Sequence, residues 1–267
     1  MFTNSAKNFI RIIIKTIKLL STKRNGKMMP KVKKETKPAE RSDLPHKAYM
    51  GIRQMLFYNE ITAGQKIKYQ DLADRLDVSI TPVIHALKWL EFKGIVRHEP
   101  NKGYYVNEVS LQEIREIYET RLALEVAILP QTISNLDESS IQRLQASLEA
   151  FEEKVKDSDY YGRLLTDMKF HFTLASLSQC RIQLKMLEEL FDLLFLKYSR
   201  NLVLSSIMET SLHEHQEIFE SLKTRNLHEV QKILSGHLEN VKDHILEKFD
   251  IMVMKKKEPI FDFHSFL

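Results

Sequence analysis

The sequence predicts a mainly α-helical protein, in which three helices and a β-hairpin precede an all-α antiparallel helical bundle. Gly and Pro number only 7 each in 267 residues, which is too few for a turn-rich all-β fold and favours long helices. From residue 46 onward, apolar residues recur at spacings of three and four, as the buried face of a helix requires. Hydrophobic residues make up 43% of the chain, enough for two ordinary domains, and this excludes wholly disordered classes.

The charge of the chain changes sign along its length. Residues 1–47 hold 13 basic and 3 acidic residues, a net charge of +10. Residues 48–108 are close to neutral at +1, and residues 109–267 carry −7. This asymmetry predicts a polyanionic partner at the N-terminal end.

We expect a cytoplasmic protein with a basic, flexible arm over residues 1–45 and no membrane partner. Residues 9–20 are apolar, but three basic residues interrupt them, so they form neither a spanning helix nor a secretory signal. A helix on a membrane surface, or upstream sequence before a start at the methionines 28 and 29, remains open for this stretch. The single cysteine, Cys180, excludes an internal disulfide framework and fits a reducing compartment.

Residues 46–108 have the order of elements of a winged helix-turn-helix. The first helix stops at Asn59, the second covers Leu72–Leu76, and a third follows Ser79 or Thr81 as its cap. A hairpin comes next, with its strands and turn at residues 95–99, 104–106 and 100–103. In this fold one helix enters the major groove of DNA and the hairpin reaches the backbone or the minor groove.

These residues resemble the DNA-binding domain of the GntR family of bacterial transcription regulators. The residues that carry the resemblance are Leu72-Ala73, the run from Leu76 to Leu87, Leu90, Gly94-Ile95-Val96, Gly103-Tyr104 and Val106. The resemblance implies a homodimer that binds a short palindromic operator in double-stranded DNA. The chain departs from the family pattern at Ile80, Ile84 and His85, where the family usually has arginines and a glutamate.

Arginine makes the commonest base contact, to guanine, and isoleucine can at best pack on thymine methyl groups. We therefore expect either an AT-leaning operator or weakened DNA binding that the basic arm assists. The expected DNA-binding residues fall into three groups. One group contacts phosphates from the second and third helices, one lies on the exposed face of the third helix, and one lies at the wing tip. They are Arg75, Ser79 and Thr81, then His85 and Lys88, then Lys102 and Gly103.

Residues 110–250 predict about six helices in an antiparallel bundle, because their connections are short. Ser110 with Glu113 forms a capping signal for the first of these helices, and Asp137 caps the second. The later apolar stripes run over residues 164–177, 184–196, 212–222 and 230–245. Residues 251–267 are left as a tail, which either docks on the bundle or stays loose.

Polar residues interrupt the inner stripes of three of these helices. Asp167 and His171 are four residues apart and share one helix face, and His215 and His237 take core-facing positions on two later helices. Several buried titratable groups without partners are costly. A divalent metal compensates for this cost, and imidazole with carboxylate suits zinc first, with nickel or manganese as alternatives.

This second part is similar to the effector-binding domain of the FadR-like branch of GntR regulators, the FCD domain. The similarity rests on the Asp167-x-x-x-His171 pair, the run from His215 to Leu222, and His237-Leu238. It implies a metal-assisted pocket for a small carboxylate effector. Arg121 and Glu125 match the pattern of its first helix, so Arg121 is expected to clamp the effector carboxylate.

The function predicted from the sequence is a DNA-binding transcriptional regulator controlled by a small organic acid at a metal site, and not an enzyme. A metal-dependent hydrolase or isomerase using the same aspartate and histidines is one alternative. It lacks a clear general base on the same helix faces. A degenerate regulator that acts through a protein partner is the other alternative, and the missing recognition arginines keep it open.

Overall fold

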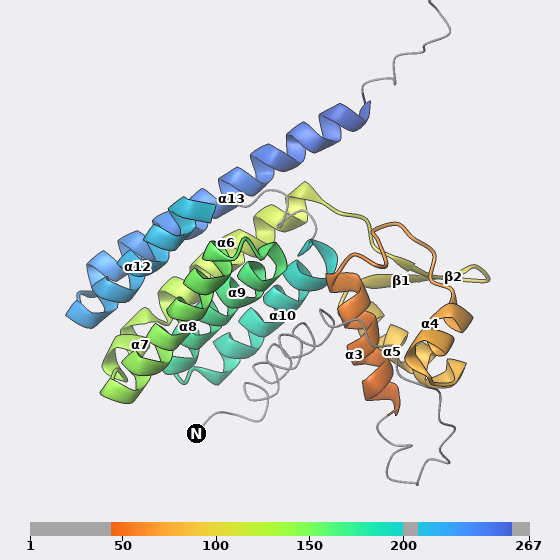
Figure 1. Ribbon diagram of the computed structural model, residues 1–267, viewed down its shortest axis with the longest axis horizontal. Coiled ribbons are helices and arrows are strands. Elements are labelled where there is room, and N and C mark those ends of the chain that lie inside the picture. Colours follow the sequence, from red (N-terminus) through yellow and green to blue (C-terminus); the bar gives the residue numbers. More distant parts are fainter. Residues whose placement is uncertain (1–43, 200–207, 258–267) are drawn as a thin grey trace, which may run out of the picture.

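The computed structural model describes residues 44–199 and 208–257. Figure 1 shows a bundle of long helices with a smaller unit of helices and a β-hairpin at one end. The arm predicted for residues 1–45 and the tail beyond residue 257 lie outside the described residues, apart from the two residues that open the first helix. Within the described segments, no helix is both long and apolar enough to cross a membrane.

The N-terminal unit has the predicted winged helix-turn-helix order. Its elements are α3 (Leu44–Phe57), α4 (Tyr69–Leu76), α5 (Ile80–Phe92), β1 (Val96–Glu99) and β2 (Gly103–Val106). The two strands pair antiparallel, with Val96 opposite Val106 and Glu99 opposite Gly103. Gly103 has a φ of +101°, a conformation that side-chain-bearing residues rarely adopt, and this closes the wing turn.

The turn between α4 and α5 is made by backbone conformation more than by side-chain capping. Asp77 ends α4 in the left-handed region with a φ of 53°, and Ser79 then takes the extended N-cap position of α5. The cap hydrogen bond expected from Ser79 is not formed, and Thr81 lies inside the helix. Pro82 is buried in the first turn, where a missing N–H leaves no hydrogen bond unmade.

The second part is the expected antiparallel bundle of helices. Its described helices are α6 (Leu111–Ala127), α7 (Leu129–Ser134), α8 (Glu138–Lys156), α9 (Tyr160–Leu177), α10 (Arg181–Lys197), α12 (Met208–Thr224) and α13 (Leu227–Lys257). The short α7 was not anticipated, because Ile128 ends α6 and starts α7 with hardly any change in backbone conformation. In addition, α13 continues past residue 250, where the sequence suggested that the bundle ends.

The predicted caps at the starts of α6 and α8 are present. The Ser110 side chain accepts a hydrogen bond from the backbone N–H of Glu113 at 3.3 Å. The Asp137 carboxylate accepts from the N–H of Ser140 at 2.6 Å, and the Ser140 hydroxyl accepts from the N–H of Asp137 at 2.8 Å. These caps satisfy N–H groups that a helix start leaves without partners, so they fix where each helix begins.

The two units share one hydrophobic core. It joins Ile52 of α3 and Leu87 of α5 to Phe191 and Tyr198 at the end of α10. Next to this core, Arg53 of α3 donates two hydrogen bonds to Asp192 of α10, at 2.7 and 2.5 Å. The winged helix is therefore packed directly on the bundle and is not held by a linker alone.

We expect the Arg53–Asp192 pair to give the fold an acid-sensitive contribution to stability. Burial opposes ionisation of Asp192, but Arg53 and Lys93 outweigh it and lower the pKa of this carboxyl below its ordinary value of 3.8. The contribution is therefore fully present above the ordinary pKa and is lost as pH falls through the folded-state pKa. At pH 7, Asp192→Asn should lower the free energy of unfolding by about 3 kcal/mol, because Arg53 is left buried with a neutral partner.

Urea unfolding measured at several pH values checks this expectation. The difference in the free energy of unfolding between the parent and Asp192→Asn should be constant from neutral pH down to about pH 5 and should decrease in stronger acid. Asp157→Asn is the matched control, because the Asp157 side chain is 58% exposed and lies 3.8 Å from Lys154. A difference for Asp192→Asn that persists unchanged in strong acid would contradict the assignment.

Candidate metal centre and DNA-binding face

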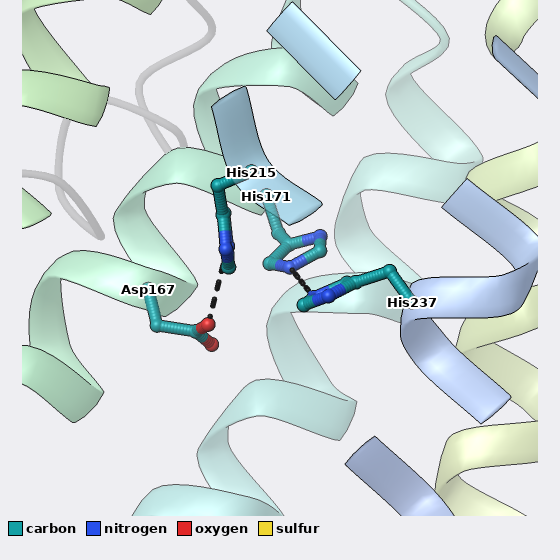
Figure 2. A group of neighbouring side chains, drawn as sticks. All are labelled: Asp167, His171, His215 and His237. Atoms are coloured by element: carbon teal, nitrogen blue, oxygen red, sulfur yellow. Dashed lines mark hydrogen bonds and ion pairs between the residues drawn. The ribbon is translucent and has the colours of Figure 1, made fainter. Parts of the chain in front are cut away.

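Four polar side chains converge inside the bundle. Asp167 and His171 lie one turn apart on α9, His215 comes from α12, and His237 comes from α13. Figure 2 shows the four side chains pointing toward one another. One ligand atom from each lies within 4.8 Å of every other, which is the span a single bound cation can bridge.

The surroundings of this cluster are apolar. His171 and His215 are fully buried and His237 is 2% exposed, whereas the Asp167 side chain is 23% exposed. The rings of Phe151 and Phe170 lie 4.6 and 4.8 Å from the His215 ring. Asp167 therefore occupies the side of the cluster that water or a small ligand can approach.

Each histidine has its Nδ1 atom next to a hydrogen-bond acceptor. The partners are a Glu125 carboxylate oxygen for His171 at 2.7 Å, a Glu214 oxygen for His237 at 2.7 Å, and the Ser211 backbone carbonyl for His215 at 2.6 Å. Carboxylates and carbonyls accept hydrogen bonds, so each Nδ1 carries the proton and each Nε2 keeps a lone pair.

The three Nε2 lone pairs face a common point. Nε2 of His171 and Nε2 of His237 are 3.2 Å apart, and Nε2 of His215 lies 3.3 Å from an Asp167 oxygen. Within the described residues, the buried Nε2 of His215 has no hydrogen-bond partner. Lone pairs that meet in this way repel unless a proton or cation lies between them, so these residues fit a divalent metal.

The electrostatics of the cluster favour the protonation states that bind metal. Burial lowers the pKa of His237 to about 4, and a positive charge on His215, when that ring is protonated, adds to this, so the His237 imidazole is neutral at neutral pH. Burial opposes ionisation of Asp167, but its contact with His215 and the other histidines hold the pKa of this carboxyl far below its ordinary range. Neutral imidazole and ionised carboxylate are the forms that act as ligands.

The two residues predicted to bind the effector lie beside this cluster, on α6. Glu125 is fully buried, and one of its oxygens accepts a hydrogen bond from Nε of Arg121 at 2.9 Å while the other meets His171. Burial opposes the charge on Glu125, but Arg121 and then His171 lower the pKa of its carboxyl to about 2. Glu125 therefore orients His171, a role that the sequence pattern did not specify.

Arg121 is a buried cation with one end unused. Its guanidinium lies over the rings of Tyr118 and Phe191, with its central carbon 5.1 and 4.9 Å from their centroids. The atom Nη2 is buried and, among the described residues, has no hydrogen-bond partner. A buried donor without a partner is costly, which is an independent sign that a ligand can bind there.

Glu214 is a functional candidate that the sequence reasoning missed. It comes from α12, and its two oxygens accept from Nδ1 of His237 and from the Asn240 side chain at 2.8 Å. The only signal in the sequence was its position directly before His215. Which carboxylate meets which histidine depends on how α12 and α13 pack, and that cannot be read from spacing along one helix.

The predicted DNA-binding residues lie on the surface of the winged helix. Thr81, His85 and Lys88 follow one face of α5 at spacings of four and three, and all are exposed. The Lys102 side chain at the wing turn is 68% exposed and forms an ion pair with Glu99 at 3.2 Å. Gly103 begins β2 beside it.

Two of the predicted phosphate-binding residues near this face differ in how accessible they are to DNA. Ser79 is exposed at the start of α5, whereas Arg75 at the end of α4 forms an ion pair with Glu60. Ile80 is 38% exposed and Ile84 is partly buried, so an apolar side chain lies at the start of the helix where the family pattern has arginine.

The comparisons with known proteins agree with this architecture. Residues 45–106 match the model of the bacterial regulatory proteins of the gntR family, and residues 116–240 match the FCD domain. By structure, the chain is similar to McbR/YncC of E. coli with a TM-score of 0.67 and 19% identity, over 77% of this chain and 98% of the other. At that identity the structural likeness shows the fold alone.

Relatives of similar sequence are described as HTH-type transcriptional regulators. The chain is 26% identical to the uncharacterized HTH-type transcriptional regulator YdhC of Bacillus subtilis, over 74% of this chain and 88% of the relative. It is 25% identical to the HTH-type transcriptional repressor RspR of Escherichia coli, over 74% and 86%.

A third relative is more similar over a shorter length. The chain is 31% identical to an uncharacterized HTH-type transcriptional regulator of the TAR-I ttuE-ttuC' intergenic region of Agrobacterium vitis, over 48% of this chain and 77% of the relative. These three relatives are described as transcriptional regulators, so the hydrolase or isomerase alternative is not retained. The chain belongs to the GntR family of bacterial regulatory proteins, as a DNA-binding transcriptional regulator whose winged helix precedes an FCD domain.

Proposed function

We propose that a small carboxylate effector controls operator binding by this regulator, and that it binds at a divalent metal held by Asp167, His171, His215 and His237. The observation that carries the proposal is the convergence of three Nε2 lone pairs and one carboxylate, with every Nδ1 already committed to an acceptor. Zinc is the first candidate, since three imidazoles and one carboxylate suit it, and nickel or manganese are the alternatives.

The effector is a small organic acid because Arg121 is cationic and a bound divalent metal would also attract a carboxylate. A divalent metal held by these four residues would bind a carboxylate oxygen by taking a fifth or sixth ligand. Arg121 offers the buried Nη2 donor, which has no partner among the described residues. The Asp167 side, at 23% exposure, is the least buried side of the cluster.

Residues of the chain orient the metal ligands and exclude water from the site. Glu125 and Glu214 hold His171 and His237 with Nε2 directed inward, and the phenylalanines around His215 exclude water. Effector binding shifts operator affinity only to the extent that it stabilises one arrangement of the winged helix over another. We also propose that the protein acts as a homodimer in the cytoplasm. The palindromic operator that the family resemblance implies would present two equivalent half-sites to such a dimer.

Removal of two imidazoles should abolish metal binding. The double variant His171→Ala/His237→Ala should reduce bound zinc from about one ion per chain to near zero, because one imidazole and one carboxylate are too few protein ligands for a stable zinc site. Elemental analysis of the purified, dialysed protein measures this directly. His213→Ala is the matched control, since His213 lies on the same helix as His215 but its side chain is 74% exposed. Equal zinc in the double variant and the parent would refute the site.

Arg121 should determine the response to carboxylates. In the zinc-loaded protein, lactate, malate and citrate are tested as a panel, and binding should raise the melting temperature. Arg121→Gln should increase the ligand concentration needed for the same rise at least tenfold, which corresponds to a loss of about 1.4 kcal/mol in binding free energy. Differential scanning fluorimetry measures both variants. Arg115→Gln is the control, because Arg115 is an exposed arginine on the same helix. An undiminished shift in Arg121→Gln would exclude the clamp.

The exposed face of α5 should bind DNA backbone. Lys88→Ala should weaken binding to a duplex from the upstream region of its own gene several-fold, and should reduce the salt slope by about 1. Fluorescence anisotropy at several salt concentrations, with a shuffled duplex beside it, gives both quantities. Lys223→Ala removes an exposed lysine of α12 and should change neither quantity. If Lys88→Ala behaves like this control, α5 is not the recognition helix.

A further inference from the structure

We propose that Asp192 is the positioning residue through which the metal pocket controls the orientation of the recognition helix α5. This inference rests on the proposed metal site and adds the route by which that site acts on DNA binding. It is argued from a buried cluster of charges in the seam between the two domains, together with a continuous series of contacts from that cluster to His171.

The cluster has Asp192 of α10 at its centre. Arg53 of α3 contacts it with both Nη atoms, at 2.7 and 2.5 Å, and Nζ of Lys93 donates to it at 3.0 Å. The side chains of Arg53 and Asp192 are 10% and 5% exposed, and that of Lys93 is 21% exposed. Tyr49 adds a hydroxyl that accepts from Arg53 at 2.9 Å.

The DNA-binding end of the cluster is Lys93. This residue is the C-cap of α5, the helix that carries Thr81, His85 and Lys88 on its exposed face. Because a helix of this length moves as a rigid rod, a change at its last residue tilts the whole exposed face. Lys93 also binds Glu189 of α10, one turn before Asp192.

The pocket end of the cluster begins at the neighbouring residue, Phe191. The Arg121 guanidinium lies 4.9 Å from the centroid of the Phe191 ring. Arg121 is bonded to Glu125, and Glu125 is bonded to Nδ1 of His171, one of the four proposed ligands. Consecutive residues of α10 therefore contact the metal pocket and the winged helix.

Charge gives this seam a property that apolar packing lacks. Burial of apolar surface is non-directional, whereas a bidentate arginine–carboxylate pair at low exposure is strong only at one relative orientation. A small rotation of α10, set by how Arg121 lies on Phe191, therefore favours one position of Arg53 and Lys93 over others. The buried pair makes the domain arrangement responsive to the pocket, and not merely stable.

Hydrogen exchange of the full-length protein, with Zn²⁺ and after metal removal, tests the proposal without a known effector or operator. In the parent, Zn²⁺ should slow exchange at least about threefold in α9, α12 and α13, and also in α3 and α5. In Asp192→Asn, the slowing in α9, α12 and α13 should remain, while the slowing in α3 and α5 should disappear.

The outcomes separate this inference from the proposed function. No effect of Zn²⁺ on α9, α12 or α13 of the parent would refute the metal site itself. A normal effect there, with a full Zn²⁺ response of α3 and α5 in Asp192→Asn, would overturn the role of Asp192. A residue that only stabilises the seam would speed exchange in α3 and α5 equally in both metal states, which would also overturn it. Asp157→Asn should behave like the parent.

A second variant keeps the test valid if Asp192→Asn does not fold. Arg53→Met combined with Asp192→Leu replaces the ion pair by apolar side chains of similar size, a change that cores usually tolerate. This variant should bind Zn²⁺ as the parent does, and its α3 and α5 should no longer respond to the metal. A retained response in the folded double variant would overturn the proposal.

Discussion

The protein depends on one electrostatic constraint, which is the meeting of three imidazole lone pairs and a carboxylate in the apolar interior of its bundle. Three helices, α9, α12 and α13, contribute these groups, and none of the three imidazoles can turn away, because each Nδ1 is held by an acceptor. A chain that only needed a stable bundle would place leucines at these positions, since buried titratable groups are costly. The arrangement therefore supports the proposed metal site.

The acceptors extend this constraint outward through the molecule. Glu125 holds His171 and is itself neutralised by Arg121, so a buried carboxylate has a partner on each side. Arg121 in turn spreads over the aromatic rings of α6 and α10. In a medium of low dielectric, each charge is tolerable only while its neighbour stays in place, so the position of each group depends on the next.

The same principle operates at the seam between the domains. Arg53 and Lys93 come from the winged helix and Asp192 from the bundle, and each would be costly in this place without the others. Unlike the hydrophobic core that the two domains share, this cluster has a preferred geometry. A regulator needs both features, because the domains have to remain together and also to have distinguishable relative positions.

The periodicity of the sequence was sufficient for the helices and for the inward direction of His171, His215 and His237, because helix faces follow directly from residue spacing. Capping residues such as Ser110 and Asp137 marked the helix starts for the same local reason. The hairpin also followed from local signals, through its strands and their glycine-containing turn.

Contacts between helices were decided only by the tertiary structure. That Glu214 meets His237, that Glu125 turns to His171, and that Asp192 joins Arg53 across 139 positions in the chain all depend on helix packing. The short α7 was also missed, although Pro130 in its first turn is a local signal for a helix start. The sequence by itself determined which faces are buried, because that is a property of one helix, whereas packing decided which buried groups become partners, because that is a property of several helices at once.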